Sequence, residues 1–143
     1  MYDNKVMKVV ENIPTDANLI GTKWVIAEKD YKKKKTRLAA LSCQQVDGED
    51  FIETYSPTVQ EDSLRLIVAI ASKFNWDLKQ LDIKAAYLNA DLEEKIYTKI
   101  PYGEKKFLIL IYSGYLKKAL YGLNQAERMW YNEISHYFSK YRF

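Results

Sequence analysis

The pattern of apolar and polar positions first indicates a β-hairpin near the start of the chain. Residues 22–28 (TKWVIAE) and 36–43 (TRLAALSC) are rich in apolar and β-branched side chains, and a lysine-rich stretch lies between them. Two such runs around a polar tip are typical of a hairpin. Residues 44–59 hold an Asp-Gly pair and a proline, which favour a loop after the hairpin.

A helix is predicted next, over residues 61–76, because apolar residues there recur at helical spacing. Asp62 or Ser63 is the expected N-cap, since short polar side chains can accept hydrogen bonds from the free N–H groups of the first turn. The apolar stripe at this spacing comprises Leu64, Ile67, Val68, Ala71 and Phe74.

A second helix is predicted over residues 124–141. Asn124 and Glu127 fit a loose capping box at its start. One face of this helix is apolar, and we expect Trp130, Tyr137 and Phe138 on that face to be core residues. The residues of that face are Trp130, Ile134, Tyr137, Phe138 and Tyr141.

Extended structure is expected between the two helices. Residues 78–84 and 94–100 are predicted strands, and residues 106–112 (KFLILIY) form a continuous apolar run that indicates a central or covered strand. Left exposed, such a run would favour aggregation. A hairpin, a helix, several strands and a final helix together predict an α+β fold.

Composition narrows the class of protein further. The chain has 143 residues, of which 48% are hydrophobic, so it can bury one core. Its net charge of +3 is a mild basic bias. A single cysteine, Cys43, cannot form an internal disulfide, and we expect it to be a small buried apolar residue in an intracellular protein. No apolar run is long enough to span a bilayer, so no membrane association is expected.

One histidine also limits the possible chemistry. His136 is expected at the surface near a helix end. Neither a His-rich metal site nor a Ser-His-Asp or Cys-His arrangement can be built from it, and this leaves no argument for a nucleophilic enzyme.

The acid Asp82 stands out because its neighbours, Leu81 and Ile83, are apolar and strand-like. Spacing alone allows a solvated acid on a half-exposed strand or a metal ligand at a strand end. Mg²⁺ needs only one or two protein carboxylates when substrate phosphates supply the other oxygens. A two-metal site would need a second acidic pair on a neighbouring strand, and the sequence holds no Asp-Asp pair.

The lysine-rich tip also has two interpretations. It can be a solvated hairpin end, as charge runs usually are. It can instead be a mobile basic loop that closes over phosphates, with Arg37 providing a planar fork at the strand start. Tyr87 alone would be interpreted as a core residue.

Three stretches together resemble a known family. They are GTKWVIAEKDYKKKKTRLAALSCQQVDGEDFIETYSPTV, LRLIVAIASKFNWDLKQLDIKAAYLNADLEEKIY and LKKALYGLNQAERMWYNEI. In this order they are similar to the reverse transcriptase of copia-type LTR retrotransposons, over roughly residues 19–138. The chain departs from the family pattern in KTRLAALSC, NQAER and PYGE, where the family has KARLVAKGF, KQSPR and PPGF.

The resemblance implies roles for individual residues. Asp82 matches the family's first catalytic aspartate, a Mg²⁺ ligand. Tyr87 matches the aromatic residue under the incoming sugar, which screens out a 2′-hydroxyl. Arg37 and Lys35 match the fingers residues that meet the triphosphate, and Tyr121 matches the segment beneath the nascent base pair. The positions implied to contact the RNA or DNA template–primer are Lys32, Lys33, Lys34, Gly122, Asn124 and Gln125.

The implied fold is the fingers and part of the palm of a right-hand polymerase, with a fingers hairpin, loop and helix over about 19–76 and a partial palm with a second fingers segment over about 77–143. The family reaction adds dNTPs to a primer 3′ end, in a cytoplasmic virus-like particle or the nucleus. The Y-x-D-D hairpin with the family's other two aspartates lies past the last match, so we expect weak Mg²⁺ binding and no activity from this chain alone. A nucleic-acid-binding remnant and a functionless relic remain alternatives, and the oligomeric state is open.

Overall fold

The computed structural model describes residues 6–29, 33–100 and 113–141. Its elements confirm a mixed α+β class, with six strands and two α-helices in the described ranges. In chain order these elements are β1 (Met7–Val10), β2 (Leu19–Ile20), β3 (Thr22–Lys29), β4 (Lys33–Ala40), α1 (Glu61–Lys73), β5 (Asp91–Lys99), β6 (Ser113–Lys118) and α2 (Ala126–Tyr141). Two 3₁₀ turns, η1 (Ser42–Gln44) and η2 (Ala86–Asn89), complete the set.

A four-stranded sheet with the order β1-β6-β5-β2 forms the centre of the molecule. β6 pairs antiparallel with β1 and with β5, whereas β2 pairs parallel with β5. One face of this sheet is buried through Ile20, Ile96 and Leu116, and the first turns of α2 add Ala126 and Met129 to the same core. Burial of these apolar side chains is the main favourable contribution to the fold.

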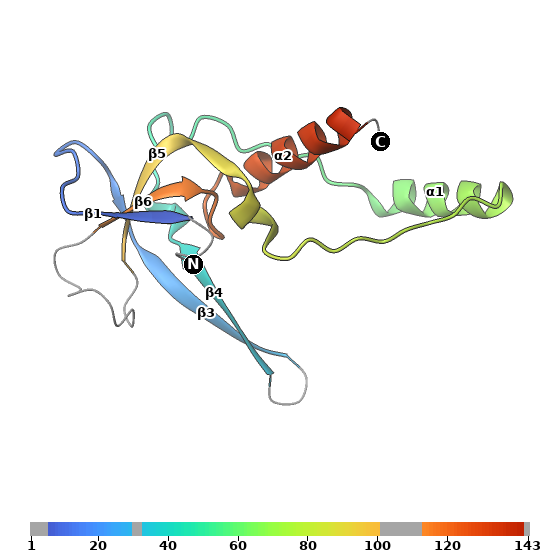
Figure 1. The fold of residues 1–143 in the computed structure, drawn as a ribbon, viewed down its shortest axis with the longest axis horizontal. Helices are drawn as coiled ribbons and strands as arrows, with labels where there is room; N and C mark the ends of the chain where they lie inside the picture. The colour runs from blue at the N-terminus through green and yellow to red at the C-terminus, as the bar shows by residue number, and fades with distance from the viewer. Residues whose placement is uncertain (1–5, 30–32, 101–112, 142–143) are drawn as a thin grey trace.

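The predicted hairpin is confirmed as the antiparallel pair β3–β4, which projects from the body of the molecule (Figure 1). β4 ends at Ala40 rather than at residue 43. Leu41 still donates its N–H to the carbonyl of Gly21, and the chain then turns into η1. This turn leaves Cys43 exposed, so the prediction that it is buried was wrong.

The first predicted helix is confirmed but is shorter than predicted. α1 ends at Lys73, followed by Asn75 in a left-handed conformation, and its N-cap is Gln60 rather than Asp62 or Ser63. α1 lies away from the sheet at the end of an extended stretch (Figure 1). Of its apolar stripe only Ala71 is buried; the exposed members are Leu64, Ile67, Val68 and Phe74.

The strand predicted over residues 78–84 is absent from the structure. This segment is irregular and exposed, and Leu81 keeps 78% of its surface in contact with solvent. An alternating pattern makes a strand only where another strand completes the hydrogen bonds, and none in the described ranges pairs with it. The strand predicted over 94–100 is confirmed as the longer β5, whereas the one predicted over 106–112 lies outside the described residues.

α2 is confirmed, but it begins at Ala126 and lacks the predicted capping box. The carboxylate of Glu127 instead accepts a hydrogen bond from the hydroxyl of Tyr87. Trp130 packs on the core as predicted. The prediction that Tyr137 and Phe138 are core residues was wrong, because both are exposed.

His136 is exposed, as predicted. Neither of the described helices is long and apolar enough to cross a membrane.

Candidate functional site

A cavity of about 570 Å³ lies between the base of the hairpin and the segment that leads into η2. Three distant parts of the chain contribute polar side chains to it. Lys35 and Arg37 come from β4, Asp82 and Lys84 come from the irregular segment after α1, and Tyr121 comes from the turn before α2. The fold therefore gathers four residues that the family resemblance singled out: Lys35, Arg37, Asp82 and Tyr121.

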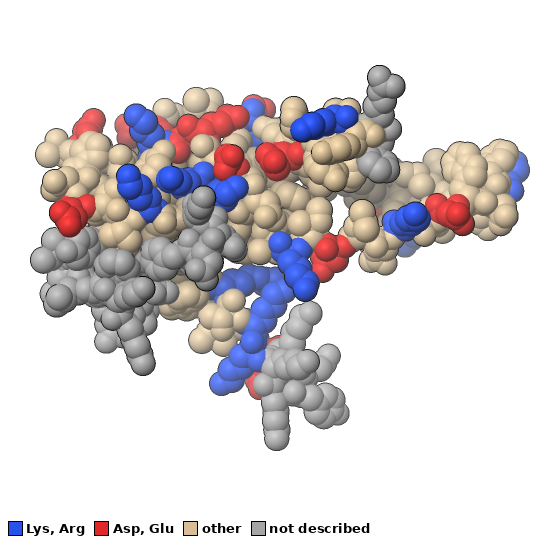
Figure 2. Space-filling model, viewed as in Figure 1, with Lys and Arg blue, Asp and Glu red and all other residues tan. Residues whose placement is uncertain are grey.

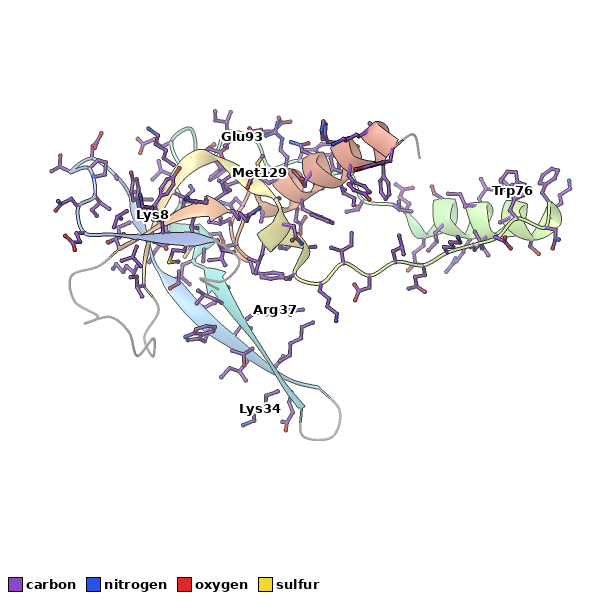
Figure 3. The ribbon with its side chains drawn as sticks, viewed as in Figure 1. Lys8, Lys34, Arg37, Trp76, Glu93 and Met129 are labelled. Carbon is purple, nitrogen blue, oxygen red and sulfur yellow. The ribbon has the colours of Figure 1, made fainter. Side chains whose placement is uncertain are left out.

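Arg37 owes its place to the register of the hairpin. It pairs with Val25 and is half-buried near the base of β4, whereas Lys34 lies closer to the tip and is exposed (Figure 3). The Arg37 guanidinium carbon lies 5.4 Å from the centroid of the Tyr121 ring. A guanidinium at this distance from an aromatic ring gains a cation–π attraction. This contact holds the positive charge at the cavity wall.

Backbone hydrogen bonding fixes Tyr121 against β4. The N–H of Ala40 donates to the carbonyl of Tyr121 over 2.7 Å, and Ala39 forms a parallel bridge with Tyr121. The next residue, Gly122, has a φ of +87°, and a Cβ built on it would lie 2.3 Å from the carbonyl oxygen of Ala40. Only glycine fits this approach, so Gly122 brings the Tyr121 segment into contact with the hairpin.

Tyr87 is a second aromatic residue, which packs next to Tyr121. Its ring centroid lies 5.0 Å from that of Tyr121, and its hydroxyl donates to Glu127 over 3.3 Å. Burial raises the pKa of Tyr87, and the negative charge of Glu127, which also accepts its hydrogen bond, raises that pKa further. Tyr87 does not line the main cavity but supports the ring that does.

Asp82 is exposed and lines the main cavity. Three residues later, Ala85 adopts a left-handed conformation with a φ of 53°, which turns the chain from the cavity wall into η2. The described residues contain no group of three or more His, Cys, Asp or Glu side chains that could enclose a metal ion. Asp82 therefore supplies one carboxylate and does not by itself fit a two-metal centre.

The residues predicted to contact template–primer lie in different environments in the structure. Lys32 and the side chain of Lys33 lie outside the described part of the chain, and Lys34 is exposed on β4. Gly122 and Asn124 line a second cavity of about 460 Å³, which Tyr87 and Glu127 also line.

Gln125 has a different environment from its neighbours. It is fully buried, and its amide donates to the carbonyl of Asp50 over 2.8 Å. Its amide oxygen accepts a hydrogen bond from Gln45 over 3.0 Å. In this position Gln125 joins the loop after β4 to the start of α2, and a template contact by its side chain stays a prediction.

Sequence reasoning missed Lys84 in the cavity wall and Glu127 as the partner of Tyr87. Lys84 follows Asp82 closely, and its proximity to that acid was the signal that could have found it. Glu127 was interpreted as a helix cap, and no local pattern indicates a hydrogen bond to a residue as distant in the sequence as Tyr87.

Comparison with known proteins gives consistent matches. A family model described as "Reverse transcriptase (RNA-dependent DNA polymerase)" matches residues 4–143. The Pol polyprotein of transposon TNT 1-94 from Nicotiana tabacum is 38% identical over 140 residues, and that of transposon RE1 from Arabidopsis thaliana is 32% identical over 139 residues. These matches cover 92% and 94% of this chain, respectively, but only 10% of each relative.

A truncated Ty1-A Gag-Pol polyprotein from Saccharomyces cerevisiae is 39% identical over 126 residues, which are 85% of this chain and 10% of that protein. No solved structure gives a significant match. The chain thus spans about a tenth of the length of the relatives that it resembles.

Proposed function

The chain belongs to the reverse transcriptase (RNA-dependent DNA polymerase) family and is similar to one segment of copia- and Ty1-type retrotransposon Pol polyproteins. From this premise we propose that its main cavity is the nucleotide side of a polymerase active site. The reaction would be attack of a primer 3′-hydroxyl on the α-phosphate of a dNTP, directed by an RNA or DNA template. Catalysis of this kind depends on positioning and on neutralisation of phosphate charge.

The observation that carries this proposal is the meeting of Arg37, Asp82 and Tyr121 around one cavity. Arg37 would bind triphosphate oxygens through its planar fork, and Lys35 would add a more mobile charge. Tyr121 offers a flat surface beneath the base pair being formed. Tyr87 does not line this cavity but packs against Tyr121 at 5.0 Å, so its proposed role of excluding a 2′-hydroxyl would require the sugar to extend beyond the main cavity.

A magnesium ion would neutralise phosphate charge in this reaction. Asp82 would contribute one oxygen ligand, and the phosphates would contribute others. Since the described residues hold no acidic cluster, the metal would need further protein ligands beyond Asp82. We therefore propose that the 143-residue chain binds Mg²⁺ weakly and does not extend a primer alone.

A chimeric polymerase tests the proposal. The segment of the tobacco TNT 1-94 Pol polyprotein that aligns with this chain would be exchanged for it, and RNA-templated primer extension would be measured. We expect activity that Asp82→Asn abolishes and that Asp91→Asn retains, because Asp91 pairs with Lys118 and does not line the cavity. A chimera as active with Asp82→Asn as without it would refute the assignment.

The unmodified chain provides the complementary measurement. Purified, it should not incorporate dNTPs on a primed template with Mg²⁺ or with Mn²⁺. Template-directed incorporation would contradict the proposal that it is inactive alone. A chimera that is inactive while the parent polymerase works would instead support a degenerate copy of the element.

The exposed basic side chains of β4 favour a second candidate function, a nucleic-acid-binding remnant that uses the hairpin. Lys34 and Lys35 are exposed, and Arg37 is half-buried nearby. Each phosphate contact that they make with duplex DNA should contribute about −0.9 to the slope of log affinity against log salt concentration. Binding that ignores both salt and replacement of these residues by alanine would exclude this candidate.

A further inference from the structure

The central sheet has an outer face that differs from its buried one. In the two inner strands, Ile96 and Leu116 point into the core, while Tyr97 and Tyr115 alternate to the other side and are half-buried. Tyr97 and Tyr115 are directly paired across β5 and β6, and their ring centroids lie 5.6 Å apart. Two aromatic rings therefore lie side by side at the middle of the sheet.

Lysine side chains surround these rings. Lys8 is the direct partner of Tyr115 on β1, Lys117 follows two residues later on β6, and Lys95 precedes Tyr97 on β5. The five residues line a shallow hollow of about 320 Å³ together with Val10 and Asn12, and no acidic residue lines it. Basic side chains gather over β1 and β6 in the view of Figure 2.

The three lysines have no ion-pair partner among the described residues. By contrast, Lys118 is on the opposite face of β6 and pairs with Asp91 over 3.1 Å. The outer face thus carries unneutralised positive charge around two aromatic surfaces, on elements separate from Arg37 and the main cavity.

From this arrangement we infer that the outer face of the sheet binds single-stranded nucleic acid, with bases on Tyr97 and Tyr115 and phosphates on Lys8, Lys95 and Lys117. Paired aromatic residues on the inner strands of a four-stranded sheet are a known geometry for stacking unpaired bases. The bases of a duplex are already stacked on one another, so they cannot stack on these rings. The inference concerns a surface apart from the proposed nucleotide site and does not rest on it.

Site mapping tests the inference directly. The 143-residue chain would be irradiated with a 12-nucleotide uridine oligomer that carries 5-iodouridine, and crosslinked peptides would be identified by mass spectrometry. Crosslinks at Tyr97 or Tyr115 are expected. Crosslinks confined to β4 or Tyr121 would overturn the inference and would assign binding to the main cavity.

Affinity measurements supply the second readout, by fluorescence anisotropy with labelled U12, dT12 and a 12-base-pair duplex. Tyr97→Leu and Tyr115→Leu should each weaken binding of the single strands about 5- to 150-fold, as expected for loss of one stacked base, whereas Tyr97→Phe should bind normally. Equal affinity for the duplex would overturn the inference.

The exposed lysines provide variants that leave the core intact if a leucine variant fails to fold. Replacing Lys8, Lys95 and Lys117 by alanine should make the salt dependence shallower. The negative slope of log affinity against log salt concentration should shrink in magnitude by about 2, because three phosphate contacts are lost. Lys23→Ala is the matched control, because Lys23 is an exposed cation of β3 that does not line this hollow, and it should leave U12 binding unchanged. A loss with Arg37→Ala alone would overturn the inference while leaving the proposed polymerase function standing.

Discussion

The guanidinium of Arg37 lies over the ring of Tyr121, with 5.4 Å between its central carbon and the ring centroid. This contact joins the base of the hairpin to the turn before α2, two regions far apart in the sequence. Both residues line the main cavity. A planar cation held in this way is suited to bidentate binding of phosphate oxygens.

Replacing Arg37 by lysine should therefore weaken binding of a triphosphate although the charge is kept. Lysine lacks the planar guanidinium, which can bind two phosphate oxygens at once and which contacts the Tyr121 ring. We therefore expect the affinity for a fluorescent dATP analogue to fall about tenfold. Lys23→Ala is the matched control, because Lys23 is an exposed cation of β3 that does not line the cavity. Equal binding by Arg37→Lys and the original chain would show that Arg37 does not meet the triphosphate.

The hydrogen bond between Tyr87 and Glu127 makes a prediction about alkaline pH. Burial and Glu127 raise the pKa of Tyr87 in the folded chain. The unfolded chain therefore loses this proton first, near the ordinary tyrosine value of about 10. The stability that the shift contributes is complete below that pH and is lost as pH rises toward the folded pKa.

Tyr87→Phe should thus show a smaller loss of unfolding free energy than the original chain as the pH rises above about 10. Other tyrosines and lysines titrate in the same range, so the informative quantity is the difference between the two chains, measured by urea unfolding at several pH values. Glu127→Gln should reduce that difference, since it removes the negative charge. Parallel pH curves for the original chain and Tyr87→Phe would contradict the explanation.

Gly122 should be the glycine least tolerant of substitution among those with a described environment. Gly122→Ala would place a Cβ 2.3 Å from the carbonyl oxygen of Ala40 in a left-handed conformation, and we expect a loss of at least about 3 kcal/mol in unfolding free energy. Gly48 has a similar φ of +82° but nothing within 4 Å of the added Cβ. Gly48→Ala should cost about 1 kcal/mol. Equal losses would show that the contact with Ala40 is not limiting.

Gln125 should contribute to stability through its buried hydrogen bonds. Gln125→Ala removes the donor to the carbonyl of Asp50 and the acceptor for Gln45, and should cost about 2 kcal/mol in urea unfolding. Asn124→Ala is the neighbouring control and should cost much less, because the backbone N–H of Asn124, and not its side chain, bonds to Gln45. If Asn124→Ala proved as destabilising as Gln125→Ala, the buried network would not be the cause.

The sequence predicted well those elements whose hydrogen bonds or apolar contacts are made by the element itself or close to it. The β3–β4 hairpin pairs with itself, and α2 buries Ala126 and Met129 within its first turns. The strand predicted around Asp82 failed because alternation says nothing about whether another strand is available. Similarly, helical spacing identified α1 but could not tell that its stripe would be exposed.

The candidate site was predictable only in part. Sequence spacing did not decide whether Asp82 is a solvated acid or a metal ligand. The family resemblance predicted that Asp82 belongs to the same site as Arg37 and Tyr121. That grouping agrees with one shared cavity in the structure. The site is supported by two hydrogen bonds, from the Tyr87 hydroxyl to Glu127 and from the Gln125 amide to the carbonyl of Asp50. Both join residues far apart in the sequence, so no local pattern predicts them.

The projection of β3–β4 from the body has a mechanical consequence. Arg37 lies about 10 Å from the point where Ala40 is hydrogen-bonded to Tyr121, and Lys34 lies about 10 Å farther out along the strand. Any rocking of the hairpin about that point would displace Lys34 about twice as far as Arg37. The outer part of the hairpin is thus better able to follow anions of different size than the part that carries Arg37.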